Sequence, residues 1–232
     1  MKKLLTRWFW RLMLLLVFII LAYQGWIFSH VVYWNHYNPS SSAFMREQLD
    51  ALQQKDEATK IRTQWVPYEQ ISPHLKRAVV AAEDGKFTKH EGFDFDAIHY
   101  AHQKNLKMGR LVAGGSTITQ QLAKNLFLSG EKTPWRKLQE AFITLMLEKV
   151  MSKRRILEIY LNVIEWGHGV FGAEAAARHY YGISAASITA KQAARLAAMI
   201  PDPRFYDTQR HTTRLSRKSG IILGRMASAK IP

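Results

Sequence analysis

A long apolar run near the N-terminus constrains this chain more than any other feature of its sequence. Residues 12–34 are mostly apolar: no strongly polar residue interrupts the first half, and only Gln24, Ser29 and His30 interrupt the second. A membrane-spanning helix needs about 20 mostly apolar residues. Aromatic residues gather at both ends of the run, as in the interfacial belts of such helices. We therefore predict a transmembrane anchor over residues 12–34.

The charges that flank this run predict its orientation. Lys2, Lys3, Arg7 and Arg11 precede it, and basic flanks favour the cytoplasmic side. We expect residues 1–11 to form a cytoplasmic basic tail and the rest of the chain to lie outside. A cleaved signal peptide is the alternative. The anchor is favoured because the run is long and no small-residue cleavage site follows it closely.

Composition limits what the remaining chain can be. Residues 35–43 resemble a short linker, and residues 44–232 suit one domain, since domains commonly have about 100–200 residues. The 33 Lys and Arg against 18 Asp and Glu give a net charge of +15. Such an excess suits nucleic acid, an anionic membrane surface or a phosphate-bearing substrate. The absence of cysteine excludes disulfides and thiolate metal sites.

The pattern of caps and apolar spacing predicts a mainly α domain. Helix starts are indicated at Ser72-Pro73, at Thr117 with Gln120, at Thr133-Pro134 and at Thr189 with Gln192. A further helix is expected from near Asp94 or Asp96 to about Lys107. Partial alternation over residues 59–66 predicts one short strand.

Four segments stand out by their acidic, basic or glycine residues. They are residues 83–92, 114–121 with Lys124, 136–140 and 153–162. Glu83 falls at the expected C-terminal end of a helix, where the macrodipole opposes negative charge by about 0.3–1 kcal/mol and raises the pKa. A carboxylate with a raised pKa suits a general base; the alternative is a solvated helix-end glutamate.

Each of the other segments, taken alone, fits an ordinary structural role as well as a functional one. Arg136, Lys137 and Glu140 share a helix face, which also suits an ordinary surface ion pair. His90 has no second histidine or acid at metal-ligand spacing, so we predict a hydrogen-bonded histidine and no metal site.

Taken in order, the segments carry a signature. They contain E-D-x-x-F-x-x-H-x-G at 83–92, G-G-S-T-I-T-Q-Q at 114–121, R-K-x-x-E at 136–140 and K-x-x-I-L-E-x-Y-L-N at 153–162. This set resembles peptidoglycan glycosyltransferase family 51 over about residues 66–203. The resemblance implies a lysozyme-like glycosyltransferase domain. It also implies a monofunctional member, because no S-x-x-K transpeptidase motif follows.

The resemblance implies a role for each matching residue. Glu83 matches the general base that deprotonates the acceptor 4-hydroxyl, and Glu140 matches a second essential carboxylate. The matching substrate-binding residues are Ser116, Thr117, Gln120, Gln121, Lys124, Arg136, Lys137 and Lys153. The structural matches are Asp84, His90, Glu158 and Asn162.

The reaction that the resemblance implies is the transfer of a growing lipid-linked chain onto the 4-hydroxyl of lipid II, with inversion and release of undecaprenyl diphosphate. No cofactor is required, although a divalent cation could assist the diphosphate. The expected partners are lipid II, the growing chain, the membrane and other cell-wall synthesis proteins, but no nucleic acid. The expected location is a bacterial inner membrane with a periplasmic catalytic domain.

Physical chemistry agrees with this reaction, and two alternatives stay open. A diphosphate leaving group needs preorganised cations, whereas a glycan hydrolase needs a protonated acid. Residues 104–112 mix basic and apolar residues, which suits either an interfacial element or an ordinary basic loop. The alternatives are a lytic enzyme on a lysozyme-like fold and a basic, membrane-tethered binding protein.

Overall fold

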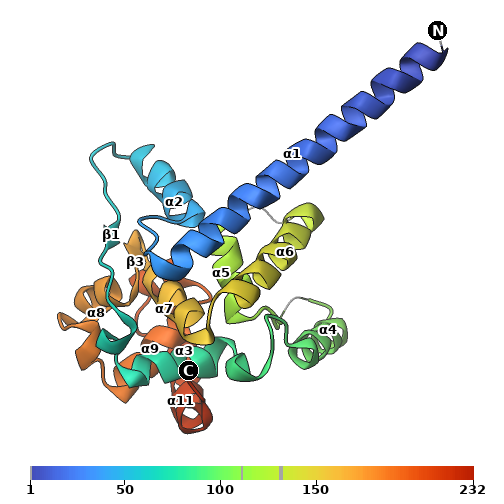
Figure 1. Ribbon diagram of the computed structural model, residues 1–232. Helices are drawn as coiled ribbons and strands as arrows, with labels where there is room; N and C mark the ends of the chain where they lie inside the picture. Colours follow the sequence, from blue (N-terminus) through green and yellow to red (C-terminus); the bar gives the residue numbers. More distant parts are fainter. Residues whose placement is uncertain (1, 111, 131–132) are drawn as a thin grey trace.

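A computed structural model describes residues 2–110, 112–130 and 133–232. One long helix, α1 (Lys2–His36), projects from a helical domain (Figure 1), and the predicted mainly α class is confirmed. Two predictions fall outside the described residues: the cytoplasmic placement of Met1, and Leu111 within the expected interfacial segment. The other helices are α2 (Ala43–Gln53), α3 (Pro73–Glu83), α4 (Phe95–Met108), α5 (Ile118–Phe127), α6 (Pro134–Val150), α7 (Lys153–Val163), α8 (Ala173–Tyr181), α9 (Ala190–Met199), α10 (Pro203–Thr208) and α11 (Thr213–Arg225).

The predicted helix starts are confirmed by their hydrogen bonds. The side chains of Thr117 and Thr189 each form a capping box with the glutamine three residues later. Those of Ser72 and Thr133 accept hydrogen bonds from backbone N–H groups in the first turn that follows. Each cap pairs a donor that a helix N-terminus would otherwise leave free. Local sequence therefore fixes where these helices begin.

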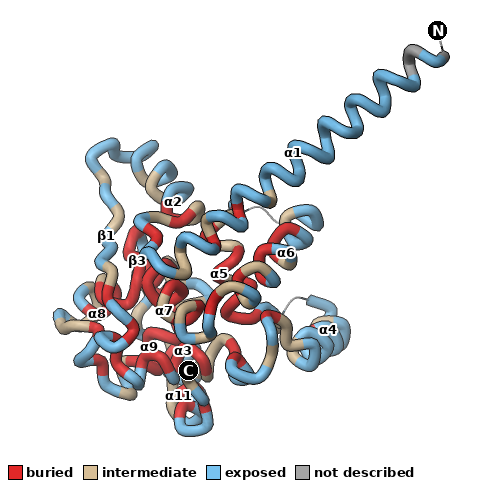
Figure 2. The backbone as a smooth tube through the Cα atoms, viewed as in Figure 1, coloured by how far each residue is buried: buried red, intermediate tan, exposed pale blue. Residues whose placement is uncertain are grey.

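The core lies where α3, α9 and α11 pack together, with α5 between α6 and α7 (Figure 2). Ile118, Leu122 and Leu126 are buried along one face of α5, as their spacing predicts. A small sheet borders this core. Its order is β1 (Arg62–Thr63), β3 (Val170–Phe171), β2 (Glu165–Gly167), with β1 parallel and β2 antiparallel to β3. The single predicted strand is confirmed at β1.

Helix α1 includes most of the predicted basic tail and all of the predicted span. It runs unbroken from Lys2 to His36, because no proline separates the basic residues from the apolar ones. It is long and apolar enough to cross a membrane, and most of its described side chains are exposed. Ile27 and Val31, however, are fully buried against the domain. The last turns of α1 are therefore part of the packed structure.

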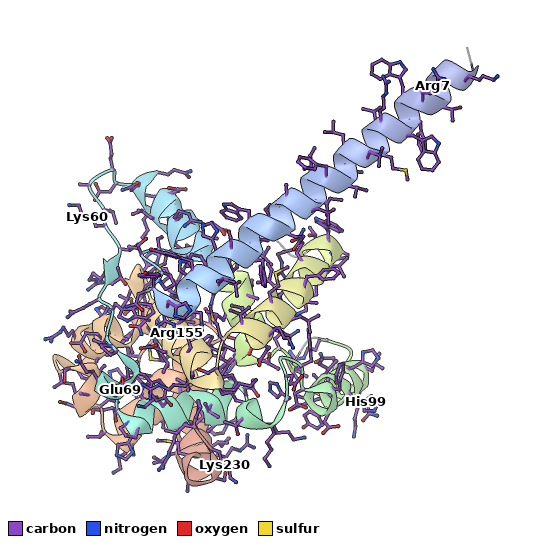
Figure 3. The ribbon with its side chains drawn as sticks, in the orientation of Figure 1. Arg7, Lys60, Glu69, His99, Arg155 and Lys230 are labelled. Carbon is purple, nitrogen blue, oxygen red and sulfur yellow. The ribbon has the colours of Figure 1, made fainter. Side chains whose placement is uncertain are left out.

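Arg155 of α7 joins the domain to the end of α1 (Figure 3). Its guanidinium donates to the carbonyl oxygen of Trp34 at 2.8 and 2.9 Å and to that of Tyr37 at 2.6 Å. It also pairs with Glu158 at 2.7 Å. The last carbonyls of a helix lack partners within it, and positive charge is favourable there. We call this arrangement the Arg155 clamp.

Helix α6 leaves its apolar stripe exposed. Trp135, Leu138, Phe142 and Leu145 are 48–60% exposed, while Gln139, Glu140 and Thr144 are buried. Helix α6 lies alongside α1 (Figure 1). A large exposed apolar stripe next to a candidate spanning helix is typical of a surface that contacts a membrane.

Candidate active site

Glu83, the last residue of α3, borders a cavity of about 760 Å³. Ser116 and Gln121, two of the predicted substrate-binding residues, line the same cavity. So do four basic side chains that the motifs do not include. These are Lys104, Arg214, Lys218 and Arg225. The cavity therefore places two carboxylates, Glu83 and Asp202, among four cations.

Two polar residues hold the carboxylate of Glu83. Gln121 donates from Nε2 to Glu83 Oε2 at 2.8 Å, and the buried Tyr160 hydroxyl donates to Gln121 Oε1 at 2.8 Å. Tyr160 thereby fixes which end of the Gln121 amide faces Glu83. Burial raises the pKa of Glu83, while Gln121 and Lys218 oppose the rise. The direction agrees with the prediction, and burial is its largest cause.

A second group surrounds Glu140 on α6. This carboxylate is buried, and it pairs with Arg136 at 2.8 Å and with Lys137. Lys124 lies close enough to this group to interact with it electrostatically. Burial, and secondly the positive charge of Arg136, lower the pKa of Lys124. We call Lys124, Arg136 and Lys137 the cation cluster. Three cations against the carboxylates of Glu140 and Glu47 leave an excess of positive charge that suits an anionic ligand.

The two groups are neighbours on the same side of α5. Gln121, which holds Glu83, precedes Lys124 by one helical turn, so both side chains share a face. Ser116 lines the Glu83 cavity and also lies 3.4 Å from Lys137 Nζ. A carboxylate with a raised pKa and the cation cluster therefore lie near each other, although Lys124, Arg136 and Lys137 do not line the Glu83 cavity.

Comparison with known sequences agrees with this geometry. The sequence model of the Transglycosylase family matches residues 48–227. The chain belongs to this family. The family assignment confirms the predicted resemblance, including its lysozyme-like domain.

Close relatives extend the match over nearly the whole chain. A biosynthetic peptidoglycan transglycosylase of Nitrosospira multiformis is 73% identical and covers 97% of this chain and 98% of its own. Proteins of the same name from Methylobacillus flagellatus and Chromobacterium violaceum are 63% and 57% identical. They cover 97% and 98% of this chain, and 98% and 100% of their own lengths.

Three predicted substrate-binding residues of this transglycosylase are engaged elsewhere. The side chains of Thr117 and Gln120 are buried in the capping box of α5, and Thr117 Oγ1 also donates to the carbonyl oxygen of Gly92. Lys153 pairs with Glu148 at 2.7 Å and lies over the ring of Phe87. These contacts favour shaping of the loops around the site over direct contact with a ligand.

The predicted structural residues all make internal contacts. Asp84 accepts from His90 Nε2 at 2.9 Å and from the backbone N–H of Ile118 at 3.0 Å, which ties the first motif to the start of α5. Glu158 accepts from the backbone N–H of Tyr68. Among the described residues, no group of three histidine, aspartate or glutamate side chains could hold a metal ion.

Replacing Asn162 by alanine is expected to lower the free energy of unfolding by about 2–4 kcal/mol. The Asn162 amide pairs with both the N–H and the carbonyl oxygen of Val66, and it donates to the carbonyl oxygen of Glu158. Alanine would leave the backbone N–H and carbonyl oxygen of buried Val66 unpaired. Thermal unfolding in detergent measures the loss, with the exposed Gln64→Ala as a control expected within about 0.5 kcal/mol. An unchanged unfolding temperature for Asn162→Ala would contradict the structural role.

Motif reasoning missed the basic residues of α11 and the hydroxyl of Tyr160. Arg214 and Lys218 stand four residues apart, which places both on one face of α11. That spacing was visible in the sequence. That the face is turned toward Glu83 depends on how α11 packs against α3 and α9, and no local pattern encodes this packing.

Proposed function

We propose that this transglycosylase polymerises peptidoglycan glycan strands from lipid II. In the proposed reaction, the growing lipid-linked chain is transferred onto the 4-hydroxyl of lipid II, with inversion and release of undecaprenyl diphosphate. The observation that carries the proposal is that Gln121, which holds Glu83, lies one turn along α5 from Lys124 of the cation cluster. The names of the relatives support the same activity.

Glu83 is the proposed general base. Its carboxylate takes the proton of the acceptor 4-hydroxyl while that oxygen forms a bond to the anomeric carbon of the donor. The bond from this carbon to the diphosphate oxygen breaks, and its electron pair stays with the diphosphate. Gln121 and Tyr160 support this role, because they fix the carboxylate toward the cavity. Attack opposite the leaving group inverts the anomeric centre.

Lys124, Arg136 and Lys137 are the proposed stabilisers of the leaving diphosphate. Negative charge grows on that group as the bond breaks, and cations already in place lower the barrier. Glu140 holds Arg136 and Lys137 in position through its two ion pairs. Arg214 and Lys218, which line the same cavity as Glu83, suit the diphosphate of the acceptor.

The membrane placement is part of the proposal. One N-terminal apolar helix supports a single-pass anchor. We propose that residues 1–11 lie in the cytoplasm and that the catalytic domain is periplasmic, on the outer face of a bacterial inner membrane. The basic residues before the span support this orientation, and other cell-wall synthesis proteins are expected partners there.

The decisive experiment supplies the full-length protein with labelled lipid II in detergent or vesicles. Lengthening glycan chains and release of undecaprenyl diphosphate are expected, and parallel reactions with a chelator test the need for a divalent cation. Shortening of preformed strands without use of lipid II would instead indicate a lytic enzyme. Binding without either reaction would indicate a tethered binding protein.

The acidic limb of the pH profile of kcat/KM is expected to lie above pH 4.5, the ordinary pKa of a glutamate side chain. Burial raises the pKa of Glu83, so the base is lost as the pH falls through this raised value. Lys218 lowers the pKa of Glu83. The Lys218→Met variant should therefore move the limb to higher pH, while exposed Lys191→Met should not. A limb at or below pH 4.5 would contradict the assignment of Glu83 as base.

A further inference from the structure

A second cavity, of about 450 Å³, lies between α1 and the start of α6. We call it the α1–α6 groove. Its apolar walls come from both helices and from the end of α5, and one guanidinium lines it. The wall residues used below are Ile19, Ile20, Tyr23, Phe127, Trp135 and Arg136.

Arg136 connects this groove with the proposed site. It lines the groove, and its NH1 pairs with Glu140 inside the cation cluster. Its Nε is buried, and no described residue accepts a hydrogen bond from it. An anion held by the cation cluster thus lies at the polar end of an apolar groove.

The wall that α1 contributes is fixed in place. Buried Ile27 and Val31 and the Arg155 clamp hold the end of α1 on the domain. Closer to the groove, Gln24 Nε2 donates to Gln139 Oε1 at 3.4 Å, and Trp26 contacts the ring of Phe127 edge-on. The groove is therefore a feature of the packed fold.

The position of the groove along the candidate spanning helix indicates an occupant that comes from the bilayer. Ile19, Ile20 and Tyr23 lie in the candidate spanning helix, so the groove opens where lipid chains are the surrounding solvent. Such chains gain little from burial as such, because the bilayer is equally apolar. A chain would be selected by its fit and by the charge attached to its end.

We propose that the α1–α6 groove binds the first isoprene units of the prenyl chain whose diphosphate lies at Arg136. This proposal rests on the proposed function, because it assigns the lipid part of the same donor. The groove holds the chain next to the cation cluster and so directs the diphosphate toward Lys124 and Lys137. Anchor helix and catalytic domain then form one binding site.

Photocrosslinking tests the occupant directly. The probe is a prenyl diphosphate with a photoreactive group near its diphosphate end, added to full-length protein in vesicles of phosphatidylethanolamine and phosphatidylglycerol. Adducts are expected on Ile20, Tyr23 and Trp135. Unlabelled prenyl diphosphate should remove them, and added phosphatidylglycerol should not. Adducts only outside the groove, or equal competition by phosphatidylglycerol, would overturn the proposal.

A matched pair of variants tests the effect on turnover. Ile20→Trp places an indole in the groove, whereas Leu21→Trp places it on the neighbouring, 65% exposed position outside the groove lining. We expect Ile20→Trp to raise the KM for long-chain lipid II by about three- to tenfold. Leu21→Trp should not change it, and a short-chain substrate should not distinguish the two variants.

The outcomes separate this proposal from the proposed function. If the parent protein fails to polymerise lipid II, the proposed function is wrong. If the parent polymerises but the two tryptophan variants behave alike with long-chain lipid II, the groove proposal alone is wrong.

Discussion

Replacement of Glu83 by glutamine is expected to reduce the rate of glycan polymerisation by about 10²–10⁴-fold, the range for loss of a general base. The glutamine keeps the size of the side chain and still fits beside Gln121, but it cannot accept the proton of the acceptor hydroxyl. Because the carboxylate is costly to bury, as its raised pKa indicates, the variant should fold at least as well as the parent. The measurement is the rate of chain lengthening at saturating lipid II.

A second buried glutamate supplies the control. Glu174 of α8 is buried and accepts a hydrogen bond from the backbone N–H of Ala185, and it does not line the Glu83 cavity. Glu174→Gln should polymerise at close to the parent rate. An active Glu83→Gln variant would refute the proposed base, whatever the control shows.

Replacement of Lys124 by methionine is expected to lower kcat by about 10²–10³-fold, the cost of removing one preorganised charge from a transition state. The lowered pKa of Lys124 means that its positive charge is less favourable in the folded protein than in the unfolded chain. Methionine keeps the apolar stem and removes this unfavourable charge. Thermal stability should therefore be unchanged or higher, which separates a loss of activity from unfolding.

The kinetic pattern identifies what Lys124 does. Loss of charge stabilisation at the leaving diphosphate should reduce kcat more than it changes KM. The exposed Lys191→Met variant, which removes one positive charge elsewhere, should match the parent. A rise in KM alone for Lys124→Met would indicate ground-state binding and would contradict a role in the transition state.

Local chemistry made much of this fold predictable. The caps at Ser72, Thr117, Thr133 and Thr189 bond to backbone N–H groups two or three residues later. Such helix starts can therefore be predicted from a few neighbouring residues. The apolar run of α1 could likewise be recognised from composition alone. Packing between distant segments was not encoded locally. The exposure of the apolar stripe on α6, and the burial of Glu140 on its other face, depend on where α1 and α5 lie.

The candidate site shows the same division. Glu83 and the cation cluster were identified from ordered motifs, and the structure links them through Gln121 and Lys124 on one face of α5. Arg214 and Lys218 reach the cavity from a helix about 130 residues further along the chain. Thr117 and Gln120 fit the signature equally well as ligands or as caps. Their burial inside the α5 capping box could be read only from the folded chain.

We expect the Arg155 clamp to couple the tilt of the anchor helix, and with it the thickness of the bilayer, to the catalytic domain. A spanning helix that is too long or too short for the local hydrocarbon layer commonly responds by tilting. If a flexible linker joined the helix to the domain, the helix could tilt without rotating the domain. Here the end of α1 is bonded to α7 and packed against the domain, so a tilt of the helix rotates the catalytic cavity by the same angle. Lipid composition would then set the orientation at which lipid II meets Glu83.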